Sequence, residues 1–129
     1  MLSQEEEENL YQLLESLQEE HINIALQIAA ANSYTIDSSP YDKLIRFLGD
    51  SYLPILKKGD LIEKLKTIGN FSSINRYFTK KIALDIPKKI QLFKKLSHLS
   101  LVGTIEKLTL PESFANLRAL KSLRINGSS

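Results

Sequence analysis

The chain contains no cysteine among its 129 residues. This absence excludes disulfide bonds, thiolate metal sites and cysteine nucleophiles. The chain also has no apolar run near the roughly 20 residues that a membrane-spanning helix needs. Its first residues are acidic rather than basic, which is not the pattern of a secretory signal, so we expect a cytoplasmic location.

Residues that typically carry catalysis are also scarce. The two histidines, His21 and His98, are far apart and lack the spacing that pairs zinc ligands on a helix. Neither glycine motif that cradles phosphate, GxxxxGK[ST] or GxGxxG, occurs. Asp85, Glu106 and Glu112 form no recognisable acid–base pair in the sequence. We therefore expect no enzyme activity, no cofactor and no metal.

The composition is that of one soluble globular domain, with 43% hydrophobic and 25% charged residues. The net charge of +2 hides an asymmetry: the first 20 residues hold seven glutamates and no base, whereas the rest hold 17 bases and eight acids. Such polarity can steer partners. An acidic first helix and solvated lysines also account for this asymmetry, and we favour this explanation.

The last third of the chain repeats itself with a period of 24 residues. Nearly every matched position is apolar, small or proline, and a period of this size is typical of solenoid repeats. The matched pairs are Ile86 with Leu110, Pro87 with Pro111, Ile90 with Phe114, Phe93 with Leu117, Leu96 with Leu120, Leu99 with Leu123, Leu101 with Ile125 and Gly103 with Gly127.

Each unit contains the pattern LxxLxL, at 96–101 and 120–125. Its last two apolar residues alternate with a polar one, as in a short strand with one buried face. Apolar residues at every third position precede it, after a proline, and predict a helix or 3₁₀ turn. The two units resemble the leucine-rich repeat family in its proline-containing bacterial form. This resemblance implies a short solenoid segment with a small parallel sheet, whose units must pack on neighbours.

The sequence departs from the family pattern after each strand. The family's asparagine is replaced by Thr104 and Ser128, and the segment Gly103–Leu110 is about one residue too long for the family pattern. Threonine or serine can still cap backbone groups, so we expect an altered turn at this place.

The residues before the repeat predict an α-helical region. Ser3-x-x-Glu6 is a capping box for the first helix, and Asn23 is a candidate cap for the second. This first pair of helices resembles the helical leader that precedes leucine-rich repeats in some bacterial proteins. The predicted helices are 3–19, 23–32, 39–48 and 60–69, with a packed connector at 51–58.

The junction between the two parts is ambiguous. Phe71–Lys81 mixes apolar residues at helical spacing with asparagine and serine, which favour turns. Ile82–Ile86 alternates like a short strand and takes the place of a degenerate first repeat. We therefore predict a mostly α, α/β fold, with a helical cap (1–81) packed on a leucine-rich repeat segment of about two repeats (82–129).

The resemblance also implies where a partner binds, because the concave sheet of this family presents solvent-facing strand residues to proteins. Arg124 is the expected anchor, since arginine is enriched in interface hot spots. Two strands alone would be narrow for a specific groove, so the alternative of no binding face stays open. The candidate partner-binding residues are Ser97, His98, Ser100, Val102, Lys121, Ser122, Arg124 and Asn126.

We therefore expect a non-catalytic protein–protein interaction module. The alternative is a small basic nucleic-acid-binding module, which would need the lysine pairs on one face beside stacking aromatics. We favour solvated lysines over such a patch. The pairs are at 57–58, 80–81, 88–89 and 94–95.

The last predicted strand would leave an unpaired edge. Solenoids usually close with a capping repeat. We expect the chain to be the first part of a longer array, or else the edge to be covered by a partner or by self-association.

Overall fold

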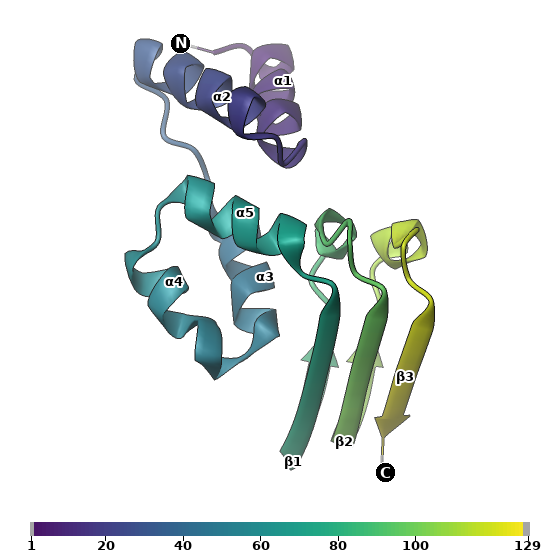
Figure 1. Ribbon diagram of the computed structural model, residues 1–129. Helices are drawn as coiled ribbons and strands as arrows, with labels where there is room; N and C mark the ends of the chain where they lie inside the picture. The colour runs from purple at the N-terminus through teal and green to yellow at the C-terminus, as the bar shows by residue number, and fades with distance from the viewer. Residues whose placement is uncertain (1, 128–129) are drawn as a thin grey trace.

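Five helices are followed by a three-stranded parallel sheet in the computed structural model, which describes residues 2–127 (Figure 1). Helix exceeds strand, so the predicted mostly α, α/β class with a small parallel sheet is confirmed. The elements are α1 (Gln4–Glu15), α2 (Glu19–Ala31), α3 (Ser39–Leu48), η1 (Asp50–Tyr52), α4 (Leu53–Lys58), α5 (Leu61–Asn70), β1 (Ser73–Asp85), η2 (Ile90–Leu92), β2 (His98–Thr109), η3 (Glu112–Asn116) and β3 (Ser122–Gly127).

The predicted capping box opens α1. The Glu6 N–H donates to Ser3 Oγ at 3.2 Å, and the Ser3 N–H donates to Glu6 Oε1 at 3.1 Å. The predicted end of this helix near residue 19 is wrong, because Leu17 adopts a left-handed φ of 62°. The hydroxyl of Ser16 donates to the Leu13 carbonyl and so competes with the helical pattern. A second helix therefore starts at Glu19, and Asn23 is not its cap.

The helices predicted at 39–48 and 60–69 are present, and they begin and end at residues suited to those places. Pro40 lies in the first turn of α3, and Gly49 ends it with a φ of 113°. Asp60 caps α5 by accepting from the Glu63 N–H at 2.9 Å. The connector at 51–58 folds as η1 and α4.

The first strand begins earlier than predicted. Phe71–Lys81 gave no clear prediction, and the short strand expected at 82–86 is the second half of β1. The expected division between residues 81 and 82 therefore falls inside a strand. Pairing with β2 supplies backbone partners and buries Ile74, and this tertiary context overrides the turn preference of the local residues. α5 then precedes β1 as η2 precedes β2 and η3 precedes β3.

The expected turn after the second strand is also wrong. The segment Gly103–Leu110 continues as β2 to Thr109, so Thr104 lies in a strand, and Ser128 lies outside the described residues. The ladder bends here, because the three residues 79–81 of β1 lie opposite the single residue Thr104 of β2. Beyond this bulge both strands turn back behind their first halves (Figure 1).

The repeat period of 24 residues matches the register between β2 and β3. Each paired residue of β2 lies beside the residue 24 positions later in β3. Leu99 and Leu101 are buried as predicted, and so are Ile90 and Phe93 of the return segment. Leu123 lies beside Leu99 in the register and so faces the same side, as predicted, but it is 48% exposed because β3 is an outer strand.

The helices and the sheet share one hydrophobic core. Phe71, after α5, packs edge-on against Phe93 with ring centroids 6.4 Å apart. Glu15 at the end of α1 pairs with Lys89 at 2.9 Å, and its carbonyl accepts from Lys94 at 3.0 Å. These contacts tie the first helix to the segment around η2.

Candidate partner-binding face

The parallel register brings alternate residues of three strands into rows on the side of the sheet opposite the buried leucines. Side chains alternate along a strand, so the neighbours of buried Ile74, Leu99 and Leu101 face the other way. The rows are Ser73–His98–Ser122, Asn75–Ser100–Arg124 and Tyr77–Val102–Asn126.

We use the name open face for the eight described side chains of these rows. None of the eight is acidic, and Arg124 gives the face a positive charge. Its edges and corners are exposed, whereas Ser100 and Val102 on the central strand are half-buried. The open face consists of Ser73, Asn75, Tyr77, His98, Ser100, Val102, Ser122 and Arg124.

The structure brings most of the predicted binding residues together. His98, Ser100, Val102, Ser122 and Arg124 belong to the open face. The backbone of Asn126 is in the third row, but its side chain lies outside the described part of the chain.

Two predicted residues lie just before the strands instead. Ser97 Oγ donates to the Ser72 carbonyl at 3.1 Å and lies 2.7 Å from His98 Nδ1. The Lys121 N–H donates to the Ser97 carbonyl at 2.8 Å. These backbone bonds stack the entry points of successive strands, so we assign Ser97 and Lys121 to the rim.

Sequence reasoning missed the first column of the open face. Ser73, Asn75 and Tyr77 come from β1, whose alternation is interrupted by Arg76 at an inward position. The one available signal was Ile74 and Phe78 flanking that arginine at even spacing. Tyr77 is 72% exposed, the highest value among the exposed large hydrophobic residues of the described chain.

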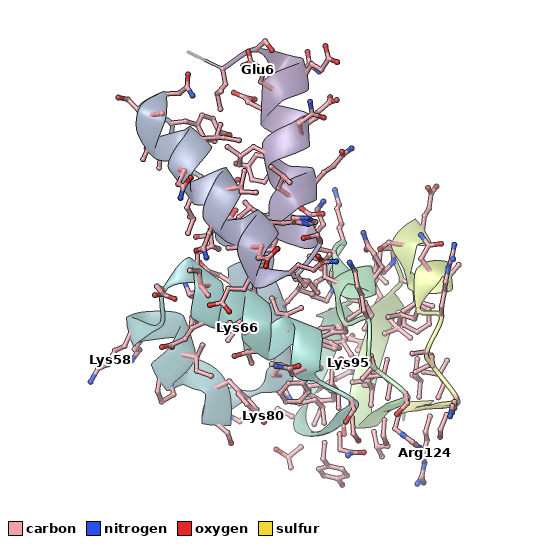
Figure 2. All side chains as sticks on the ribbon, turned by 45° about the horizontal axis from the view of Figure 1, so that its top comes forward. Glu6, Lys58, Lys66, Lys80, Lys95 and Arg124 are labelled. Atoms are coloured by element: carbon pink, nitrogen blue, oxygen red, sulfur yellow. The ribbon has the colours of Figure 1, made fainter. Side chains whose placement is uncertain are left out.

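Not all of the lysine pairs gather on one face, although Lys89 and Lys94 both contact Glu15 at the end of α1. Figure 2 shows Lys58, Lys80 and Lys95 at separate places on the molecule. Several lysines are engaged in structural contacts: Lys95 Nζ donates to Asn70 Oδ1 at 3.2 Å, and Lys81 lies 3.8 Å from Glu106. This dispersal is unlike the continuous basic groove that tracks a nucleic-acid backbone.

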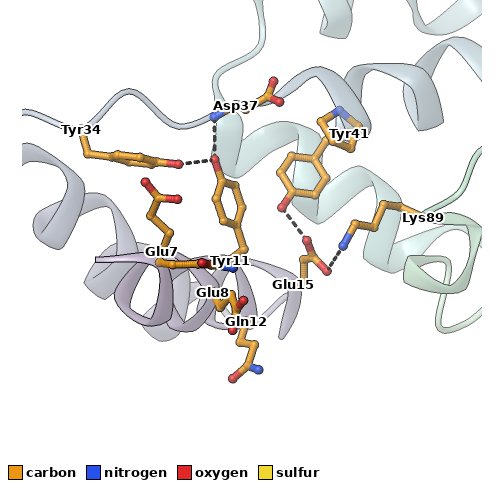
Figure 3. A pocket seen from close by; sticks show the side chains of 11 residues that line it. Glu7, Glu8, Tyr11, Gln12, Glu15, Tyr34, Asp37, Tyr41 and Lys89 are labelled. Carbon is orange, nitrogen blue, oxygen red and sulfur yellow. Dashed lines mark hydrogen bonds and ion pairs between the residues drawn. The ribbon is translucent and has the colours of Figure 1, made fainter. Parts of the chain in front are cut away.

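A pocket of about 680 Å³ lies between α1 and the segment leading into α3 (Figure 3). The hydroxyls of Tyr11 and Tyr34 are 2.9 Å apart, and the Asp37 N–H donates to Tyr11 at 2.9 Å. The hydrogen bond with Tyr11 raises the pKa of Tyr34 to about 12. These groups bond to one another, so we assign them to holding the helical cap together.

Three other residues that line this pocket, Tyr41, Glu15 and Lys89, also form hydrogen bonds with one another. The Tyr41 hydroxyl donates to Glu15 Oε2 at 2.8 Å, and Lys89 Nζ donates to Glu15 Oε1 at 2.9 Å. Burial, together with the Glu15 carboxylate, raises the pKa of Tyr41 above its ordinary value.

Residues 2–127 contain no group of three or more histidines, cysteines or acids that could hold a metal ion. His21 lies 3.1 Å from Ser16 Oγ at the end of α1, away from His98 on the sheet. Within the same range no helix has the length and apolar character needed to cross a bilayer.

Comparisons with known proteins give no further guide, since no protein-family model, no curated protein and no solved structure matches this chain.

Proposed function

We propose that this chain is a non-catalytic interaction module of leucine-rich-repeat type, which binds a protein partner through the open face. The observation that carries the proposal is the register, which adds β1 to the two predicted strands and so makes the face three strands wide. The 24-residue period that suggested the family is the same offset that pairs β2 with β3. We also propose a cytoplasmic location, which fractionation of source cells tests.

The residue types of the open face suit protein recognition. Tyr77 is exposed on β1 and Arg124 is exposed on β3. Tyrosine and arginine are the side chains most enriched in binding hot spots, together with tryptophan. A tyrosine contributes a large rigid surface with one polar tip, and so immobilising it costs little rotamer entropy.

The dimensions of the open face fit an extended segment of a partner. Three strands spaced about 4.8 Å apart span roughly 10 Å, and six residues along a strand span roughly 20 Å. The area of the open face, roughly 200 Å² from these two lengths, is smaller than the ~800 Å² that each partner contributes to a standard protein interface. A partner therefore inserts a loop or strand here and makes its other contacts on the rim.

The test is quantitative affinity purification from source cells with the wild-type chain, Tyr77→Ala, Arg124→Ala and the matched control Lys58→Ala. We expect a discrete set of proteins that both face variants lose and the control keeps. Partners that stay bound above about 300 mM salt are distinguished from nucleic acid, whose counterion-driven binding falls steeply with salt.

The opposite outcome is equally specific. Partners that all four chains recover alike would rule out the open face. A labelled oligonucleotide that binds the wild-type chain and is released by moderate salt would favour the nucleic-acid alternative.

A further inference from the structure

A second concave region lies on the other side of the sheet, between α3 and β1. It has a volume of about 840 Å³, and its apolar walls include Phe47 of α3 together with Phe78, Leu84 and Ile86. We call it the α3–β1 groove. Its size is within the range of cavities that bind small organic molecules.

Arg76 lines this groove from a position that the repeat pattern reserves for the core. The register aligns Arg76 with Leu101 of β2, which is fully buried, and with Ile125 of β3. In this row of inward-facing positions, β1 therefore has a charged arginine where the other two strands have apolar residues. α3 covers this place in part, so the arginine is half-buried rather than solvated.

Among the side chains that the structure describes, none gives the charge of Arg76 a counter-charge. Its Nη1 donates to the Phe47 carbonyl at 2.7 Å, and its guanidinium carbon lies 5.1 Å from the centre of the Phe78 ring. No aspartate or glutamate forms an ion pair with it in the described part of the chain. A guanidinium has five N–H donors, and a half-buried one without an anion keeps part of its desolvation cost.

Other charges around the groove have the same sign. Lys43, Arg46 and Lys88 also line it, against the single acid Asp85. Lys89 is a further lining residue, but it is already paired with Glu15. The groove therefore combines apolar walls with an excess of positive charge.

We propose that the α3–β1 groove binds a free amphipathic anion, of the class of long-chain carboxylates. The carboxylate accepts from the remaining donors of Arg76, with Lys43 and Arg46 adding to the attraction. The hydrocarbon chain lies against the apolar walls. A carboxylate suits a guanidinium because two parallel hydrogen bonds can form between them. This site is separate from the open face, since Arg76 and Tyr77 point to opposite sides of β1.

The test is calorimetric titration of the full chain with dodecanoate below its micellar concentration. The variants are Arg76→Leu, the exposed substitution Arg46→Glu, and the control Lys58→Leu, which removes one charge at the end of α4. Leucine is the residue that β2 carries in this row, so Arg76→Leu is compatible with the fold. Arg46→Glu changes an exposed side chain and supplies a second test should Arg76→Leu fail to fold.

We expect one dodecanoate per wild-type chain and unchanged affinity for Lys58→Leu. Arg76→Leu should weaken binding by at least about tenfold, as expected for losing a charge-assisted hydrogen-bonded pair. Arg46→Glu should weaken it by about threefold, because its charge acts from an exposed position.

Three results would overturn the proposal. The first is that dodecanoate binds Arg76→Leu as tightly as wild type. The second is that dodecyltrimethylammonium binds as tightly as dodecanoate, and the third is that the folded wild-type chain binds no dodecanoate. Binding to anionic lipid vesicles without binding of the monomeric anion would be a case of the third result, and would indicate a membrane surface instead.

Discussion

Leu99 and Leu123 occupy the same position of successive repeats and differ in burial, which makes them a matched pair for testing the repeat account. They are direct neighbours in the ladder between β2 and β3. Leu99 is 1% exposed, whereas Leu123 is 48% exposed. Replacing each by alanine removes the same atoms from the same repeat position.

The expected costs follow from burial. Leu99→Ala removes a fully packed side chain and leaves a cavity, which typically costs about 3–5 kcal/mol. Full burial of a leucine contributes about 1.5–3 kcal/mol, so the half-exposed Leu123 contributes roughly 1 kcal/mol. The two free energies of unfolding should therefore differ by at least about 2 kcal/mol.

The assay is urea unfolding of both variants and the wild type at several protein concentrations, followed by circular dichroism. The slope with urea should stay constant, so that midpoints report stability. Equal losses in the two variants, with midpoints that rise with protein concentration, would refute this reasoning. That result would mean that another copy covers the outer strand in solution.

Three further predictions concern local structure. Ser3→Ala removes the cap of α1 and should lower the free energy of unfolding by about 1 kcal/mol, whereas the control Ser3→Thr should be tolerated. Denaturant titration measures this difference, and an unchanged midpoint for Ser3→Ala would contradict the prediction. Gly103→Ala should lower the free energy of unfolding by about 3 kcal/mol, because the glycine has a φ of 129° and a Cβ would collide with the Phe78 carbonyl oxygen. A thermal melt as stable as that of the wild type would show that the bend at Gly103 is absent. The raised pKa of Tyr34, about 12 against an ordinary 10, means that the contribution of this residue to stability is complete below pH 10 and is lost as the pH rises through 12. Ultraviolet titration should show two late-ionising phenols, Tyr34 and the buried Tyr41, and Tyr11→Phe should shift the pKa of Tyr34 toward 10. No shift would disprove the hydrogen bond as the cause.

The fold was predictable where local pattern and tertiary role agree. The alternation around Leu99 and Leu101 predicted the inward face of β2, and the capping box at Ser3 predicted the start of the first helix. At Ser16 and Leu17 a side-chain hydrogen bond and a left-handed residue end α1 early. Periodicity cannot reveal these, because the leucine spacing continues past the break.

The first half of β1 could not be predicted, for a physical reason. Its inward row contains Arg76, and its outward row begins with Ser73 and Asn75, so neither row resembles a β-strand. Only pairing with β2 makes this segment extended. The missing column of the open face and the α3–β1 groove both depend on this strand, and so both were invisible in the sequence.

The most direct test of the central claim is site-specific photocross-linking in source cells. A photoreactive benzophenone amino acid replaces Tyr77 on the open face or, as a control, Ile24, which is 45% exposed on α2. We predict discrete cross-linked proteins from position 77 that disappear when Arg124→Ala is added, and none of them from position 24. The same products from both positions, or none from position 77, would contradict the assignment of the open face as the binding surface.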